Sequence, residues 1–224
     1  MLPDDKRHHL IDILSALPKH LSPILKHKEH LLQLARQIAY FDQAGVDPRP
    51  PFYGEECTPS LKDIVAPFVS AFRVGKTNTV DGRKNFQAIF QRTPINELLL
   101  IMGQRQTSAS ISDVGGVPPL REDLWGAFDT RHKHTLSVGA RAWCKHANRS
   151  GDNFWGEVSG NDDHKNRFAQ EILRKLFAHY TWWNVFEHYK HRVVYEIRVS
   201  SGHGARWTAD GKVFIGFLEP FIEA

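Results

Sequence analysis

The chain has 224 residues, enough for one large domain or two small ones, and its formal net charge is +4 at pH 7. A composition of 41% hydrophobic and 24% charged residues excludes wholesale disorder and collagen-like structure. No apolar run reaches the ~20 residues of a membrane span, and residues 1–7 are polar. We therefore expect no membrane partner and a cytoplasmic or nuclear location. Two distant cysteines, Cys57 and Cys144, argue against a disulfide scaffold.

The first hundred residues read as helices. Residues 4–44 predict two of them, the second beginning at a Ser22–Pro23 cap and ending at Gly45. Four prolines break regular structure over residues 46–59. Helices are predicted to resume at 60–73, 82–91 and 94–103, with Thr93 capping the last.

Residues 104–120 are rich in Ser, Gly and Pro, which is typical of a mobile loop or a boundary. The sequence thus predicts a helical region at 1–103, a connector or lid at 104–130, and an α+β region at 131–224 that carries the site. One continuous domain is the alternative.

After this loop the hydrophobic period changes from helical to alternating. Residues 135–143 and 192–200 alternate as half-buried strands do, and 163–180 have a helical apolar face. A turn at 209–211 leads into a strand at 212–218. The predicted fold class is α+β, with a helical N-terminal half packed against a C-terminal antiparallel sheet with one long helix.

Two segments of the C-terminal half are rich in cations and poor in acids. Residues 131–151 hold five Lys or Arg and no acid, and residues 188–208 hold four against one acid. Guanidinium groups bind phosphate and carboxylate and stack on aromatic rings, and glycines allow close approach to a ligand. The predicted substrate-binding residues are Arg141, Arg198, Arg206, Trp143, Trp207, Glu196, Gly202 and Gly204.

The histidines supply candidates for proton transfer near neutral pH. Of the 13, His203, which stands between two glycines, and His146, which follows Lys145, are the predicted general acid–base pair, with Lys145 stabilising negative charge. The sequence favours an intracellular hydrolase or transferase acting on phosphoesters or another anionic substrate, RNA and nucleotides included.

Other interpretations stay open. The arginines would pair with carboxylates on a solvated sheet face, with the tryptophans in the core; or the basic surface would bind a nucleic acid or phospho-ligand without catalysis. A metal-dependent enzyme would use the pairs His132/His134 or His188/His191, but neither has a recognised ligand pattern. The sequence assigns no metal residues, identifies no cofactor and leaves the oligomeric state open.

Overall fold

The structure is a computed structural model that describes residues 4–45, 55–74, 80–133, 135–149, 151 and 153–220. The chain divides into two compact units. The first comprises the described residues of 1–50, 57–105 and 112–117, and the second those of 51–56, 106–111 and 118–224. Within the described residues, no helix is long and apolar enough to cross a membrane.

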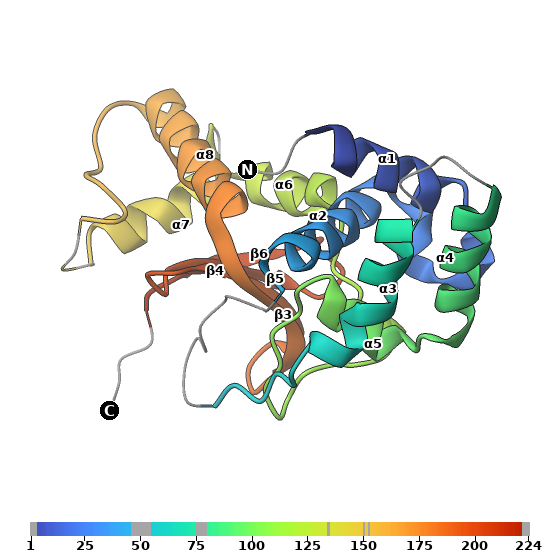
Figure 1. The fold of residues 1–224 in the computed structure, drawn as a ribbon. Helices are drawn as coiled ribbons and strands as arrows, with labels where there is room; N and C mark the ends of the chain where they lie inside the picture. The colour runs from blue at the N-terminus through green and yellow to red at the C-terminus, as the bar shows by residue number, and fades with distance from the viewer. Residues whose placement is uncertain are drawn as a thin grey trace. The chain divides into compact units, whose positions relative to one another are not determined.

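The first unit is helical, as predicted (Figure 1). Its interior is built from the apolar faces of these helices, with Leu14, Ile38 and Phe68 fully buried. The elements are α1 (Asp4–Ser15), the 3-10 helices Lys19–Leu21 and Pro23–Lys26, α2 (Lys28–Ala44), α3 (Lys62–Val74), α4 (Val80–Arg92), α5 (Ile95–Ile101) and the 3-10 helix Val114–Gly116.

The helix caps correct two details of the prediction. Ser22 caps the 3-10 helix that follows it, accepting the Ile24 N–H, and α2 begins only after that helix. Pro94 rather than Thr93 occupies the N-cap of α5, because the Thr93 hydroxyl donates back to a carbonyl of α4. Gly45 ends α2 in the left-handed conformation, as predicted. The predicted break at 46–59 lies partly outside the described residues.

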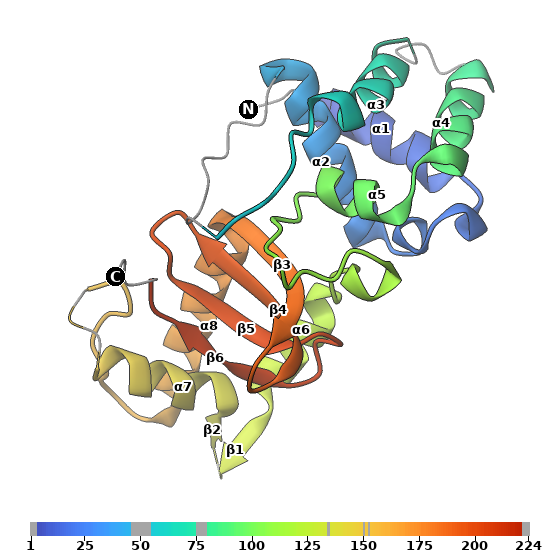
Figure 2. The same cartoon turned by 90° about the horizontal axis from the view of Figure 1, so that it is seen from below.

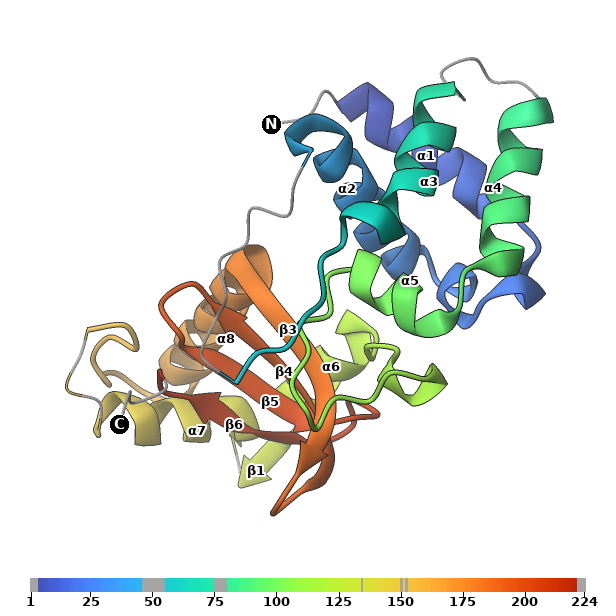
Figure 3. The same cartoon turned by 60° about the horizontal axis from the view of Figure 1, so that its bottom comes forward.

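The second unit confirms the α+β class. Its four long strands form an antiparallel sheet in the order β3-β4-β5-β6 (Figure 3), and one long helix, α8, lies against one face (Figure 2). The elements are α6 (Arg121–Asp129), β1 (Arg131–Lys133), β2 (Leu136–Ser137), α7 (Val138–Ala147), α8 (Asp162–His179), β3 (Tyr180–His188), β4 (Arg192–Val199), β5 (Gly204–Thr208) and β6 (Phe214–Leu218).

The two faces of this sheet differ in chemistry. On the α8 side, Trp207 stacks on Phe177 of α8 with ring centroids 6.0 Å apart, and its indole donates to the Leu124 carbonyl at 3.0 Å. Because side chains alternate along a strand, the residues between these core positions face the other way. On that second face, the register places Glu196 between Asn184 and Arg206. We call this the polar face.

The predicted strand at 135–143 is wrong, because most of this segment is the helix α7. Ser137 accepts the Ala140 N–H at 3.1 Å and so caps the helix. The small residues at alternate positions fit a helix as well as a strand, and Gly139 lets the helix pass close to the Phe128 ring. Strand β3 escaped prediction because residues 182–185 are buried on both faces and do not alternate.

Strand β5 begins at Gly204, two residues after Gly202. A Cβ on Gly204 would lie 2.1 Å from the Ile197 carbonyl oxygen, and one on Gly202 (φ +90°) would lie 3.0 Å from Pro220. These two glycines therefore let parts of the protein's own backbone pack closely.

We predict that Gly204→Ala lowers the free energy of unfolding by about 2 kcal/mol, because the backbone it would touch cannot rotate away. Gly216→Ala in β6 is the matched control, since nothing lies within 4 Å of a Cβ there. Denaturant titrations of both variants, followed by tryptophan fluorescence, measure the difference. Equal stabilities would contradict the close packing.

Candidate functional site

A buried carboxylate between two guanidinium groups lies at the centre of the polar face. Glu196, which is 1% exposed, accepts a hydrogen bond from Arg198 Nε through Oε1. Its Oε2 accepts from Arg206 Nε at 2.7 Å, and Arg206 Nη2 lies 2.6 Å from the same oxygen in an ion pair. Three of the predicted substrate-binding residues thus come together, and they carry a net charge of about +1 when all are ionised.

The burial of this cluster makes it a functional candidate. Removing ions from water costs several kcal/mol per ion, and ion pairs with good geometry do no more than repay that cost. A hydrophobic cluster of similar volume would stabilise a sheet at least as well. Ionised groups that are held together in this way therefore mark a candidate site for recognition or catalysis.

The two arginines have different surroundings. Arg198 is 3% exposed, and its Nη1 donates to the Gly202 carbonyl at 2.6 Å and to the Glu219 carbonyl at 2.9 Å. It therefore ties the loop after β4 to the residue that follows β6. The Arg206 side chain is 14% exposed, so solvent reaches this end of the network.

His188, at the end of β3, completes the network. Arg206 Nη1 lies 2.8 Å from its Nε2, and the Lys190 backbone nitrogen lies 3.2 Å from its Nδ1. Each ring nitrogen faces a donor, whereas an imidazolium needs two acceptors. Burial, followed by the charge of Arg206, lowers the pKa of His188 below the usual histidine value. We conclude that His188 is neutral at pH 7.

Sequence reasoning missed the role of His188. The sequence suggests this residue only as a metal-ligand partner of His191, because residues 182–185 lack the alternation that would indicate β3. With β3 in place, its pairing with β4 sets His188 opposite Arg192, at the strand end nearest Arg206. The contact of His188 with Arg206 therefore depends on the pairing of β3 with β4, which local sequence patterns do not show.

The two predicted catalytic histidines come together elsewhere in the second unit. His146 Nδ1 lies 2.8 Å from Glu219 Oε1, and His203 Nε2 lies 3.7 Å from Glu219 Oε2. The Trp155 indole donates to the same carboxylate at 2.9 Å, and Phe154 stacks on His203 at 3.8 Å. The Glu219 side chain is 41% exposed, so this cluster offers an approaching ligand a carboxylate. Sequence reasoning did not single out Glu219.

The predicted tryptophans are buried in the core, and the predicted cations of α7 are exposed. Trp143 and Trp207 are 0% exposed, and their indoles donate to backbone carbonyls, which leaves no ring face for a ligand. Arg141 and Lys145 are exposed on α7. Because α7 replaces the strand predicted at 135–143, Arg141 does not lie on the sheet with Arg198.

The thiol of Cys144 is also unsuited to nucleophilic chemistry. Burial raises its pKa, and the nearby Lys165 opposes this only in part. The neutral thiol therefore predominates at pH 7, whereas the thiolate is the reactive form.

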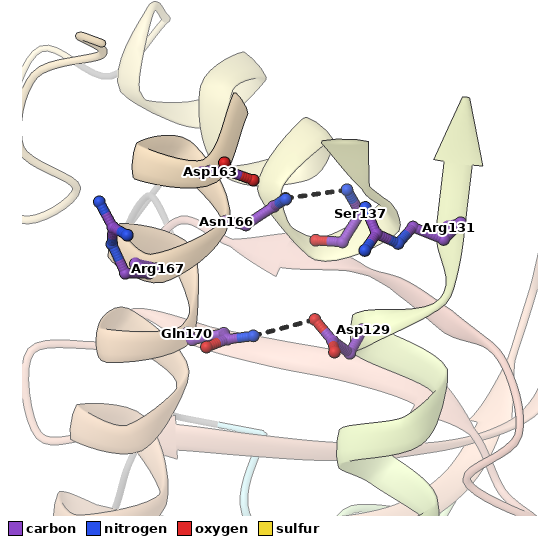
Figure 4. A pocket seen from close by; sticks show the side chains of 7 residues that line it. All are labelled: Asp129, Arg131, Ser137, Asp163, Asn166, Arg167 and Gln170. Atoms are coloured by element: carbon purple, nitrogen blue, oxygen red, sulfur yellow. Dashed lines mark hydrogen bonds between the residues drawn. The ribbon is translucent and has the colours of Figure 1, made fainter. Parts of the chain in front are cut away.

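A polar cavity of about 240 Å³ lies between α6, β1 and α8 (Figure 4). Its facing groups bind one another: Gln170 donates to Asp129 at 3.0 Å, and Asn166 accepts the Ser137 N–H at 2.9 Å. Charges of both signs line it, so it favours no ligand class. Its lining residues are Asp129, Arg131, Ser137, Asp163, Asn166, Arg167 and Gln170.

The described residues contain no group of three or more His, Cys, Asp or Glu placed to hold a metal ion. Of the pairs named for the metal-dependent alternative, His134 lies outside the described residues, and the rings of His188 and His191 stack at 5.1 Å.

The lowered pKa of His188 predicts a pH dependence of stability. The unfolded chain binds the His188 proton at higher pH than the folded chain, so stability is lost as pH falls from about 6.5. We expect His188→Gln to lose less unfolding free energy than the wild type between pH 7.5 and 5.5. Denaturant titrations across this range measure the slope. His191→Gln is the control, and an unchanged slope in His188→Gln would contradict the assignment.

Comparison with known proteins bears on the second unit. Residues 127–219, less than half of the chain, match a family model described as the CdiA C-terminal tRNase toxin domain. The matched region runs from within α6 to Glu219 and contains α7, α8 and all four strands of the sheet. No curated protein and no solved structure matches the chain. Both the Glu196 network and the Glu219 cluster lie within the region similar to this toxin domain.

Proposed function

We propose that the second unit cleaves RNA and that Glu196, Arg206 and His188 form its active site. The observation that carries the proposal is the position of Arg206. Its guanidinium lies between the buried Glu196 carboxylate and the neutral His188 imidazole, at the end of the polar face that solvent reaches. The similarity of residues 127–219 to a tRNase toxin domain supports RNA as the substrate.

The arrangement suits phosphodiester cleavage through the ribose 2′-hydroxyl. When RNA binds, the 2′-hydroxyl takes the place of the Arg206 N–H at Nε2 of neutral His188. This nitrogen then accepts the 2′-hydroxyl proton as the 2′-oxygen attacks the neighbouring phosphorus. The bond from phosphorus to the 5′-oxygen breaks, and the imidazolium returns its proton to that oxygen. The products are a 2′,3′-cyclic phosphate and a 5′-hydroxyl end.

Arg206 supplies the positive charge for this step. A guanidinium has five N–H donors, and the hydrogen bonds of Arg206 to Glu196 and His188 use those of Nε and Nη1. The others are available to a phosphate, whose negative charge grows as the 2′-oxygen attacks. Glu196 positions Arg206, so its contribution is indirect.

Local charge favours this site over the Glu219 cluster. The Glu196 network is net positive, whereas the Glu219 cluster presents a partly exposed carboxylate to an incoming phosphate. The assignment of His203, His146 and Lys145 as catalytic residues stays a prediction, and the cleavage assay tests it directly.

We further propose tRNA as the substrate, from the printed description of the matching family. A tRNA substrate fits the intracellular location expected from the sequence. Faster cleavage of tRNA than of an unstructured RNA of equal length would support this choice. Equal rates would indicate a ribonuclease without a preference for tRNA.

We predict that His188→Ala and Arg206→Ala each lower kcat/KM for RNA cleavage by about 10²–10⁴, because one removes the base and the other the positive charge. His179→Ala and Arg83→Ala, exposed residues outside both clusters, are the matched controls. The assay uses the full chain with a labelled RNA, a chelator arm and an all-deoxy substrate, which lacks the nucleophile and stays intact.

Parallel assays of His203→Ala and His146→Ala complete the test. Loss of cleavage in these two, with His188→Ala and Arg206→Ala fully active, would move the active site to the Glu219 cluster. Cleavage that disappears with chelator would favour the metal-dependent alternative. Salt-sensitive RNA binding without cleavage would instead indicate a binding module.

A further inference from the structure

The turn between β3 and β4 projects an aromatic residue into solvent. Tyr189 is 85% exposed, the largest exposed fraction among the large hydrophobic residues that the structure describes. Its ring lies 4.7 Å from that of His188, and Lys190 Nζ lies 5.2 Å from its centroid. We call residues 189–192 the hairpin tip.

Local contacts hold the hairpin tip in one conformation. The His191 N–H donates to the His188 carbonyl at 3.2 Å, and the rings of these two residues stack at 5.1 Å. Arg192 closes the turn with a φ of 59°, in the left-handed region that residues other than glycine rarely adopt. These contacts fix the turn, so the exposed Tyr189 ring keeps its position beside the His188 ring.

The hairpin tip is cationic as well as aromatic. Lys190 and Arg192 are exposed, and the nearest acid along β3, Glu187, is exposed just before the turn. The other acid of this hairpin, Glu196, already has two arginine partners. An aromatic ring among cations is the surface that binds unpaired nucleotides, since every base has a face that can stack.

We infer that the hairpin tip binds the single-stranded part of the RNA beside the cleaved phosphate, with an unpaired base stacked on Tyr189 and phosphates at Lys190 and Arg192. The inference rests on the proposed function, because His188 joins the hairpin tip to Arg206. Paired bases have no free face for Tyr189. The site therefore selects loops or single-stranded ends over helical stems.

Binding is tested apart from cleavage with a 2′-O-methyl RNA, which has no free 2′-hydroxyl. Fluorescence anisotropy with the full chain compares a single-stranded octamer with the same sequence in a duplex. We expect Tyr189→Ala to weaken octamer binding at least about fivefold, Tyr189→Phe to retain it, and neither to change duplex binding.

Salt dependence tests the phosphate contacts. Lys190→Ala is expected to reduce the slope of log affinity against log salt by about 0.7, the value for one contact with a single strand. Lys212→Ala, an exposed lysine in the β5–β6 turn, is the matched control and leaves the slope unchanged. With cleavable RNA, Tyr189→Ala raises KM more than it lowers kcat.

Unchanged octamer affinity in Tyr189→Ala, or equal losses for octamer and duplex, would overturn the inference. This failure is distinct from failure of the proposed function. If the wild-type chain binds the octamer through Tyr189 but cleaves no RNA, the hairpin tip is confirmed as a binding site and the catalytic assignment is wrong. If His188→Ala abolishes cleavage while Tyr189→Ala binds normally, the reverse holds.

Discussion

The structure of the polar face depends on one carboxylate that neutralises two guanidinium groups. Glu196 meets Arg198 through one oxygen and Arg206 through the other, and the three side chains lie on neighbouring strands. Without the carboxylate, two cations would face each other on a largely buried surface, which costs several kcal/mol. With it, Arg198 ties the β4–β5 loop to Glu219, and Arg206 meets His188. Folding and the proposed chemistry thus depend on the same carboxylate.

The sheet separates two tasks by its two faces. The face toward α8 buries aromatic rings such as Trp207 and supplies the hydrophobic free energy of the second unit. The opposite face carries the ionic network, whose net stabilisation is small. Residues of the ionic network can be substituted without loss of the aromatic core on the α8 side, because alternation along each strand assigns every residue to one face.

The predicted site residues fall into two groups: those that strand alternation identified, and those whose position depends on residues distant in the sequence. Residues at strand positions that the alternation identified, Glu196 and Arg198, came together with Arg206 as the sequence suggested. Arg141 and Trp143 do not join them, because both lie on a helix whose small residues mimic strand alternation. His188 and Glu219 were missed because their partners are distant in sequence. His146 and His203 come together around Glu219 and the Trp155 ring.

The sequence by itself determined the α+β class, the helices of the first unit, the long helix α8 and two strands of the sheet. Periodicity, caps and turn residues are local signals, and a local pattern is enough to form these elements. Tertiary structure alone decided that α7 is a helix, that β3 and β5 join the sheet, and which charged side chains meet. The reason is that contacts across strands and at strand ends depend on register, which burial of the opposite face sets over long sequence separations.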